Sequence, residues 1–278
     1  METRGSQIET LNVVGCGRVG QTLLRLWHSH GVLEIQDVLT NALTSAKIAC
    51  DAIGAGQPAP SLQAMRPASL WMVAVPDAQI ARVAQHMAAH GKGSPAAVVF
   101  HCSGALDATA LAPLAALGWP VASAHCILSF ASVAAALEQF HGTPCSLEGD
   151  RDACVVLRDA FTAIGAQCFD LARQDKLLYH AAAVFATNFL PVLQATAEAL
   201  WHSTGVPAAL IPGLRTALLH NAVANITAQG PRGALTGPAA RGDTVAVARQ
   251  ARAVGQWDEA TGAAYEALSA LALRLAKT

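Results

Sequence analysis

The chain has 278 residues, of which 53% are hydrophobic and 13% are charged, with a formal net charge of −1. This length suits one large domain or two modest ones, and the apolar composition predicts a sizeable core or subunit interface. The near-neutral charge, without a basic block, argues against nucleic-acid binding. Because no apolar run of about 18 residues is uninterrupted, we expect no membrane-spanning helix.

The N-terminal stretch and the cysteines bear on the cellular compartment of the protein and on metal binding. The polar opening stretch METRGSQIET leads directly into a strand-like segment and does not resemble a secretory signal. The seven cysteines are odd in number, scattered, and form no C-x-x-C pair. They predict reduced thiols in a cytoplasmic protein, and we expect no metal site.

A glycine-rich loop follows the first predicted strand. Residues 11–14 (LNVV) read as a buried strand, GCGRVG follows at once, and an amphipathic helix then runs to Gly31. The G-x-G-x-x-G spacing allows a tight turn, close approach of a pyrophosphate to the backbone, and tight packing of helix on strand. The helix N-terminus attracts the phosphates. The sequence thus predicts a dinucleotide site, with loop residues Gly15, Cys16, Gly17, Arg18, Val19 and Gly20.

The end of the second predicted strand bears on the choice of cofactor. This strand, residues 35–40, ends at Thr40 and Asn41, where an NAD site usually has Asp or Glu for the ribose hydroxyls. Asp37 lies too early in the strand to serve. Neutral and basic groups, including Arg18 in the glycine loop, tolerate a 2′-phosphate better than a carboxylate does. We therefore predict NADP, with NAD as the alternative, and include Thr40 and Asn41 in the cofactor site.

Three further predicted strands, residues 70–75, 97–101 and 120–124, are separated by helical segments. This alternation predicts an α/β, doubly wound parallel sheet, in which ligands lie beyond the carboxyl ends of the strands. We expect Asp77 to cap a helix and His101 to be structural. The candidate site residues at these strand ends are Val75 and Pro76 for the cofactor, and Ser103 and His125 for the substrate.

The second half of the chain becomes helical. Strand-like segments at 143–147 and 167–171 flank a helix near 152–164, and alanine- and leucine-rich helices follow. We therefore predict two domains: a dinucleotide-binding sheet domain at residues 1–171, and an all-α substrate and dimerisation domain at residues 172–278.

The first helix of the second half carries polar residues in an apolar segment, DKLLYHAAAVFATN at 175–188. Lys176 and His180 are four residues apart and share one face, and Asn188 can join the same stripe. We predict these three as catalytic residues. Tyr179 is one residue out of step and is the weaker candidate. The alternative is that each of these groups is solvated or hydrogen-bonded in a core. Pro191 predicts a kink beyond the stripe.

A second irregular stretch, GALTGPAARGD at 233–243, interrupts the later helices. Arg241 is a candidate to hold a substrate carboxylate or phosphate in a bidentate clamp. Asp243 is expected to cap the next helix. The alternative is a structural loop tied by a bond between Arg241 and Asp243 or by a backbone bond.

Several of these stretches together resemble a known family, Rossmann-like proteins with a C-terminal domain of unknown function 2520. The matching stretches run from about residue 11 to 245: VVGCGRVG, VAVPDAQI, VFHCSGAL, the histidine of SAHC, KLLYHAAAVFATNFL and ALTGPAARGD. The family is similar to pyrroline-5-carboxylate reductase, ketopantoate reductase and 6-phosphogluconate dehydrogenase. Those are two-domain NAD(P) enzymes whose helical domain completes the active site and often dimerises. The resemblance implies a Rossmann fold, a dehydrogenase class and a homodimer through the helical domain.

The resemblance also bears on single residues. Lys176 matches the acid/base lysine of the hydroxyacid-dehydrogenase relatives, but the position one turn later, an asparagine there, is His180 here. Cys126 follows His125 where family members tend to have proline. Thr40 and Asn41 stand where many members have Ser-Arg.

The sequence as a whole favours an NAD(P)-dependent oxidoreductase that transfers hydride to or from a C=O or C=N carbon of a small anionic metabolite. Lys176 or His180 would carry the proton, and burial among apolar neighbours would lower the pKa of a lysine into a useful range. Asn188 and Ser103 would orient the substrate, and Arg241 would hold its anionic end. The alternatives are a non-catalytic NADP-binding sensor or scaffold, and a methyltransferase that uses the glycine loop for S-adenosylmethionine.

Overall fold

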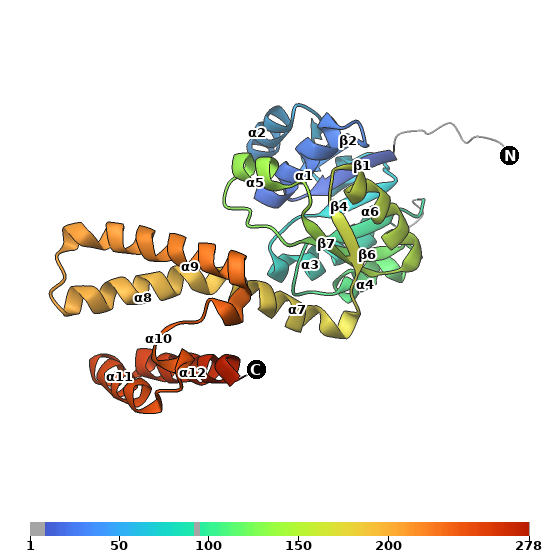
Figure 1. Ribbon diagram of the computed structural model, residues 1–278. Helices are drawn as coiled ribbons and strands as arrows, with labels where there is room; N and C mark the ends of the chain where they lie inside the picture. Colours follow the sequence, from blue (N-terminus) through green and yellow to red (C-terminus); the bar gives the residue numbers. More distant parts are fainter. Residues whose placement is uncertain (1–8, 92–94, 278) are drawn as a thin grey trace. The chain divides into compact units, whose positions relative to one another are not determined.

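The computed structural model describes residues 9–91 and 95–277, and its two compact units are Met1–Thr187 and Asn188–Thr278 (Figure 1). Each unit is described by itself below. The helix that begins at Lys176 belongs to the first unit, although the composition of the sequence changes near residue 171. The physical reason is that the first two turns of this helix hydrogen-bond to Ser123 and His125 in one strand of the first unit and to Ser103 just after another.

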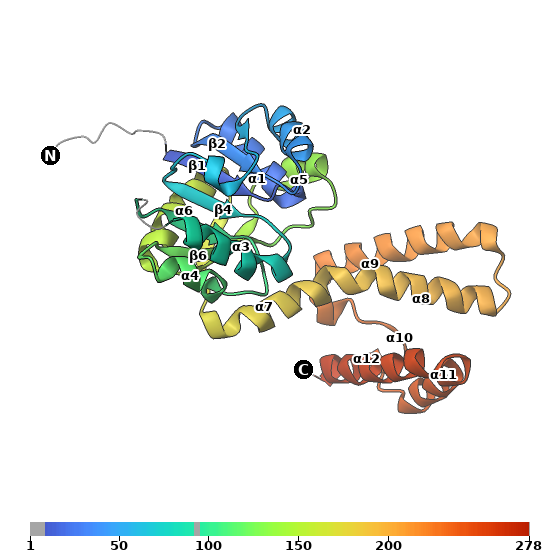
Figure 2. The same cartoon turned by 180° about the vertical axis from the view of Figure 1, so that it is seen from behind.

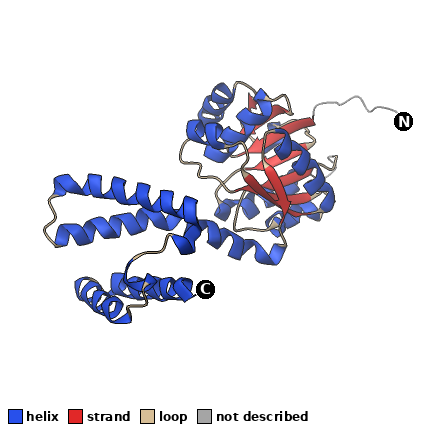
Figure 3. Ribbon diagram, viewed as in Figure 1, coloured by secondary structure: helices blue, strands red, loops and turns tan. Residues whose placement is uncertain are grey.

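The first unit is built on a sheet of eight strands, shown in red in Figure 3. Their order is β3-β2-β1-β4-β5-β6-β7-β8, and every neighbouring pair is parallel except β6 and β7. The predicted doubly wound α/β sheet is therefore confirmed. The strands are β1 (Glu9–Val14), β2 (Leu33–Leu39), β3 (Gln57–Pro58), β4 (Leu70–Val73), β5 (Val98–His101), β6 (Val121–Cys126), β7 (Pro144–Gly149) and β8 (Gln167–Asp170).

Helices cover both faces of this sheet (Figure 1, Figure 2). Leu11 and Val13 join a core with α1, α2 and α6, whereas Val14 joins a second core with α3 and α4, as expected when alternate strand residues point to opposite faces. The helices of the unit are α1 (Arg18–Ser29), α2 (Leu43–Ile53), α3 (Asp77–His90), α4 (Ala112–Ala115), α5 (Val133–Gln139), α6 (Arg151–Ala163) and α7 (Lys176–Ala183), with short 3₁₀ turns η1 (Leu62–Ala64), η2 (Ala108–Leu111) and η3 (Arg173–Asp175).

Trp27 holds the first core together. Its side chain is fully buried, and its indole N–H donates to the carbonyl of Ala160 at 2.9 Å, which links α1 to α6. Its ring meets the edges of Phe100 and Phe161 at centroid distances of 6.3 and 5.1 Å. Edge-to-face pairs of this kind add to the burial of apolar area, so α1 has a fixed position behind the glycine loop.

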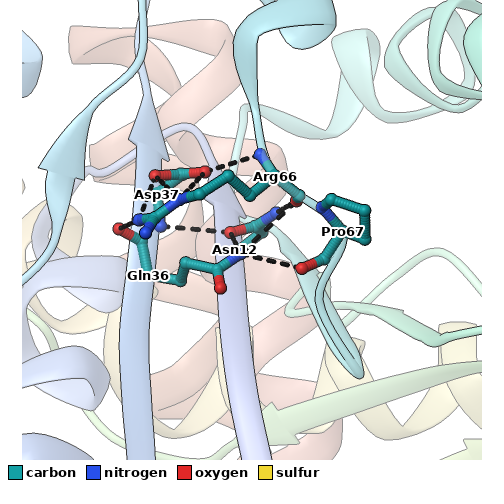
Figure 4. Close-up of polar contacts among 5 residues, drawn as sticks. All are labelled: Asn12, Gln36, Asp37, Arg66 and Pro67. Carbon is teal, nitrogen blue, oxygen red and sulfur yellow. Dashed lines mark hydrogen bonds and ion pairs between the residues drawn. The ribbon is translucent and has the colours of Figure 1, made fainter.

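A buried polar network shapes the pairing of β1 with β2 (Figure 4). The register slips between Leu11 and Val13, leaving an extra residue in β2. The Asn12 side chain fills this irregularity: its Oδ1 accepts the Asp37 backbone N–H at 3.0 Å, and its Nδ2 donates to the carbonyl of Arg66 at 2.6 Å. The Arg66 guanidinium in turn donates to the Asp37 carboxylate at 2.7 Å. The bulged backbone therefore keeps its hydrogen bonds through side chains.

The second unit consists of helices. It contains α8 (Phe189–Ser203), η5 (Ala208–Leu210), α9 (Ile211–Gly233), α10 (Gly237–Ala240), α11 (Thr244–Trp257) and α12 (Glu259–Lys277). The Asp243 carboxylate accepts the Ala246 N–H at 2.9 Å, so the predicted cap of the next helix is confirmed. The π-helical turn η4 (Val184–Asn188) precedes α8. This turn ends at Asn188, so the irregularity lies within the predicted stripe rather than beyond it, because a proline ring at position 191 displaces the carbonyls of the preceding turn.

The described helices of the second unit bury few side chains. Within the described chain, α8 buries none, and α9, α11 and α12 bury only Ile211, Ala251 and Gly262 respectively. The helical run Arg173–Ser203 contains an 18-residue window with a mean hydropathy of 1.3 and is, by length and composition, long and apolar enough to cross a membrane. The expectation of no such helix thus has one exception. A single helix that passes a test of length and composition is weak evidence of membrane insertion, and none of its 18-residue window is buried.

We predict that Asn12→Ala destabilises the protein by about 2 kcal/mol, since it leaves the buried Asp37 N–H without an acceptor. Urea unfolding followed by circular dichroism measures the change. The matched control is Asn41→Ala, which removes the same amide from an exposed position and should change stability by less than about 0.5 kcal/mol. Equal stability of the two variants would contradict the role given to Asn12.

Candidate functional site

In the glycine loop between β1 and α1, Gly15 and Gly17 differ in why a glycine stands at each position. Gly15 has a φ of 85°, and a Cβ there would lie 2.6 Å from the carbonyl oxygen of Ala74, so the backbone demands glycine. A Cβ on Gly17 would meet no atom within 4 Å. Nothing in the folded chain therefore requires glycine at position 17. The open space in front of Gly17 fits the close approach of a pyrophosphate to the backbone.

The first turn of α1 continues this anion-binding geometry. Gly17 is the N-cap residue, no side chain of the described chain caps the helix, and the first turn holds no acidic residue. The free N–H groups and the helix dipole favour a negative group at this point. Cys16, beside Gly17 in the loop, is half-buried, and burial raises the pKa of its thiol to about 12, so the loop carries no thiolate.

A cavity of about 290 Å³ opens beside the loop. The predicted cofactor residues Gly15, Thr40, Asn41 and Val75 line it, and Pro76 follows Val75 as the N-cap of α3. Its other wall comes from α3, through Gln79, Arg82, Val83 and His86, and Val14, Leu39 and Leu62 complete the lining. The residues predicted at the ends of three strands, β1, β2 and β4, thus meet at one cavity at the carboxyl edge of the sheet.

Two charged residues near the loop are engaged elsewhere. The Arg18 guanidinium donates to the carbonyl of Ala131 at 2.7 Å, in the segment after β6. The Asp37 carboxylate is buried and bound by Arg66, so it does not offer itself to a ribose (Figure 4). The interpretation that Asp37 lies too early in its strand agrees with this position.

Lys176 lies at the same carboxyl edge, at the start of α7. Only 1% of the residue is exposed. Its ammonium donates to the hydroxyl of Ser123 in β6 at 2.8 Å and to the carbonyl of Ser103, just after β5, at 3.3 Å. The lysine therefore ties α7 to the ends of β5 and β6.

Ser103 uses its whole hydroxyl inside the fold. The hydroxyl donates to the Asp77 carboxylate at 2.7 Å and accepts the N–H groups of Ala105 and Leu106 at 3.2 and 3.0 Å. One donor and two acceptor sites are all that a serine has. Asp77 is the first residue of α3 rather than its N-cap, which is Pro76. Its carboxylate is used to hold the loop after β5 in place.

The histidine predicted at the end of β6 is surrounded by two rings from α7. His125 Nδ1 lies 3.0 Å from the Tyr179 hydroxyl, and the His125 and His180 rings meet edge to face at a centroid distance of 5.7 Å. Tyr179, judged the weaker candidate because it is out of step with His180, therefore reaches the site. Both neighbours on the helix contact one imidazole because that imidazole lies between their side chains.

Gly104 faces both imidazoles. A Cβ there would lie 2.4 Å from His180 Nδ1 and 2.8 Å from His125 Nε2, so any side chain would displace a histidine. His180 Nδ1 is buried and has no hydrogen-bond partner in the described chain. A buried polar atom without a partner is costly, and at a site of this kind it is a natural place for a ligand.

The electrostatics of the edge keep His125 neutral. Burial, followed by the charges of Lys176 and His180, lowers the pKa of His125 to about 4. Burial also lowers the pKa of Lys176, while the carboxylates of Glu148, Asp107 and Asp77 act in the opposite direction. At neutral pH, His125 can therefore accept a hydrogen bond at one nitrogen and donate from the other.

Asn188 and Arg241, the other predicted site residues, belong to the second unit. Asn188 is the last residue of η4, and Arg241 follows α10 as an exposed residue. Among the described ion pairs, none joins Arg241 to Asp243. Backbone bonds tie the loop instead, because the N–H groups of Arg241 and Asp243 both donate to the carbonyl of Pro238, at 3.2 and 3.0 Å.

Two groups of residues escaped the sequence interpretation. Glu148 is buried in β7, accepts the Ala108 N–H at 2.7 Å and pairs with Arg173 at 3.4 Å. A glutamate inside an apolar strand was the available signal. The second group is the polar face of α3, formed by Gln79, Arg82 and His86. The available signal was their i, i+3, i+7 spacing, which places them on one helical face.

Family models match most of the chain. Residues 4–125 match a Rossmann-like domain, and residues 143–272 match the domain of unknown function DUF2520. No curated protein matches the chain in sequence.

Solved structures with the same fold come from several bacteria. Protein TM1727 from Thermotoga maritima is 26% identical, with a TM-score of 0.75 over 96% of this chain and 98% of that one. A putative NADP oxidoreductase, BF3122 from Bacteroides fragilis, is 20% identical, with a TM-score of 0.72 over 96% and 98%. A 1-pyrroline-5-carboxylate reductase from Streptococcus pyogenes is 14% identical, with a TM-score of 0.60 over 96% and 99%. The chain thus combines a Rossmann-like domain with a domain of unknown function 2520, as its motifs predict.

Proposed function

We propose that the protein is an NAD(P)-dependent oxidoreductase, with NADP as the favoured cofactor. One observation carries the proposal: the open glycine loop after β1 and the His125–Tyr179–His180 cluster lie at the same carboxyl edge of one sheet. Ligands of doubly wound sheets bind at this edge. The similarity to a putative NADP oxidoreductase and to a pyrroline-5-carboxylate reductase supports the same class.

The residues at the edge fit a dinucleotide. The space before Gly17 and the uncapped start of α1 suit its pyrophosphate, and the cavity at Thr40 and Asn41 suits its adenosine half. The bound cofactor would supply or accept the hydride. No acidic residue lies among the described residues that line the cavity, which favours NADP over NAD.

We assign proton transfer to His180 rather than to Lys176. His180 Nδ1 is buried without a partner in the described chain, beside Gly104 and the neutral His125. A histidine so placed can exchange a proton with a substrate oxygen or nitrogen. Lys176 is enclosed by Ser103 and Ser123, and its role is to position α7 and to supply positive charge.

The substrate we propose is a small anionic metabolite with a C=O or C=N carbon. Asn188 would orient its reacting group and Arg241 would bind its anionic end through a charge-assisted pair. Ser103, whose hydroxyl is fully used, would shape the loop rather than touch the substrate.

A non-catalytic NADP-binding sensor or scaffold is the second candidate. The commitment of Lys176 and Ser103 to internal hydrogen bonds favours it, because both were expected to serve the reaction. A sensor would need the glycine loop but no proton donor.

We also propose a homodimer through the helical domain. On α9, Leu218, Val223 and Ile226 are 50%, 58% and 48% exposed, and α8 buries none of its apolar residues. Apolar surface of this extent is normally covered by another chain.

The first test concerns the glycine loop. We predict that Gly17→Ala folds normally but weakens NADPH binding at least about 10-fold, because the methyl group occupies space needed by the pyrophosphate. Gly15→Ala, by contrast, should lose stability, since its Cβ would collide with Ala74 and its positive φ is strained for alanine. Calorimetric titration and thermal melting distinguish the two effects. Unchanged binding by a folded Gly17→Ala variant would refute the dinucleotide site.

The second test concerns the proton. We predict that His180→Asn lowers kcat by about 10²- to 10⁴-fold, the usual contribution of a general acid or base, while NADPH binding stays unchanged. NADPH oxidation at 340 nm across small 2-oxo acids and cyclic imines is the assay. The exposed His28→Asn is the control. Full activity of His180→Asn would assign the proton elsewhere, and no turnover of any substrate by the unaltered protein would favour the sensor.

The third test concerns assembly. Light scattering during size-exclusion chromatography should give a particle of two 28.6 kDa chains. The double variant Val223→Glu with Ile226→Glu should yield monomers, because charge replaces two exposed apolar side chains on one helical face. Gln229→Glu on the same helix is the control. A monomer in the unaltered protein, or a particle stable only in detergent, would contradict the dimer.

A further inference from the structure

The cavity beside the glycine loop has a polar wall that the fold does not use. Gln79, Arg82 and His86 of α3 line it together with Thr40 and Asn41 at the end of β2. Their spacing places them on one helical face. The lining of this cavity of about 290 Å³ therefore combines the glycine loop, through Gly15, with a basic group, Arg82.

Arg82 is exposed and has no ion-pair or hydrogen-bond partner within the described chain. The nearby acids are engaged: Asp37 binds Arg66, and Asp77 accepts the Ser103 hydroxyl. Because no carboxylate lines the described walls of the cavity, the guanidinium is available to an anionic ligand.

The residues predicted to bind the 2′-phosphate have fewer free hydrogen-bond donors than the sequence suggests. The Thr40 hydroxyl donates to the carbonyl of Ala42 at 2.8 Å, so its single proton is used. Arg18, the expected basic group, is bound to Ala131. Among the residues that line the cavity, the side chains of Asn41, Gln79, Arg82 and His86 are not used by a hydrogen bond within the described chain. Of these, only the Arg82 guanidinium carries a permanent positive charge.

We propose that Arg82, assisted by Asn41, recognises the 2′-phosphate of NADP and makes the protein select NADP over NAD. The inference rests on the proposed function and adds the residue that determines cofactor specificity. The basic group comes from α3 rather than from the Ser-Arg position after the second strand, which here holds Thr40 and Asn41. A guanidinium matches a phosphate in a bidentate pair, which a lysine or histidine cannot do.

A guanidinium on this wall has one other use, stacking on the adenine ring. Stacking would stabilise NAD and NADP equally, because both carry the same adenine. The two roles therefore differ in the ratio of the two affinities.

The experiment is calorimetric titration of the full-length protein with NADPH, NADH, ADP-ribose and 2′-phospho-ADP-ribose. For Arg82→Ala we expect the affinity for NADPH and for 2′-phospho-ADP-ribose to fall about 10- to 100-fold, as for loss of a charge-assisted hydrogen bond. The affinity for NADH and ADP-ribose should change less than about 2-fold. Arg82→Glu should deepen the loss for the two phosphorylated ligands only, because it repels the phosphate.

Arg25→Ala removes an exposed arginine from α1 and is the matched control, expected to bind all four ligands as the unaltered protein does. Equal weakening of NADPH and NADH by Arg82→Ala would assign stacking and overturn the proposal, as would unchanged binding of NADPH. Failure of the unaltered protein to bind any of the four ligands would instead remove the proposed function itself.

Discussion

The buried ammonium of Lys176 is the interaction on which the candidate site depends. Burying an unpaired charge is costly, so the lysine is tolerated only because the Ser123 hydroxyl and the Ser103 carbonyl accept hydrogen bonds from its ammonium group. The carboxylates of Glu148, Asp107 and Asp77 raise its pKa against the lowering effect of burial. These bonds fix the first turn of α7 against β5 and β6, and the next turn then brings Tyr179 and His180 to His125.

In the proposed site, positioning of α7 and proton transfer belong to different residues, whereas the sequence offers both Lys176 and His180 for proton transfer. Lys176 positions α7. Its positive charge also helps to lower the pKa of His125 to about 4, so that this imidazole is neutral. His180 keeps a buried nitrogen without a partner in the described chain, and Gly104 leaves room for it. A neutral histidine, a tyrosine hydroxyl and an unsatisfied imidazole nitrogen form a set that can bind and protonate a polar atom.

Local patterns in the sequence predict much of this structure. The strand before GCGRVG, the helix after it and the alternating strands follow from hydrophobic periodicity and glycine geometry, and the sheet bears them out. The strand β3 has only two residues, which is too few to show an alternation of hydrophobic and polar positions. The contacts of Arg18 with Ala131, of Lys176 with Ser123 and of Tyr179 with His125 join residues far apart in sequence, so no local pattern could reveal them. The helical unit is recognisable by its alanine- and leucine-rich composition, whereas the exposure of its apolar residues depends on tertiary packing that a local pattern does not show.

The proposed function requires that one edge of the sheet binds a nicotinamide dinucleotide next to the two histidines. A crystal structure of the full-length protein with NADPH would show this binding. We expect the pyrophosphate at Gly17, the adenosine half in the cavity at Thr40 and Asn41, and the nicotinamide ring on the side of Gly104, His125 and His180. A dinucleotide bound elsewhere, or bound here with its nicotinamide turned away from both histidines, would contradict it.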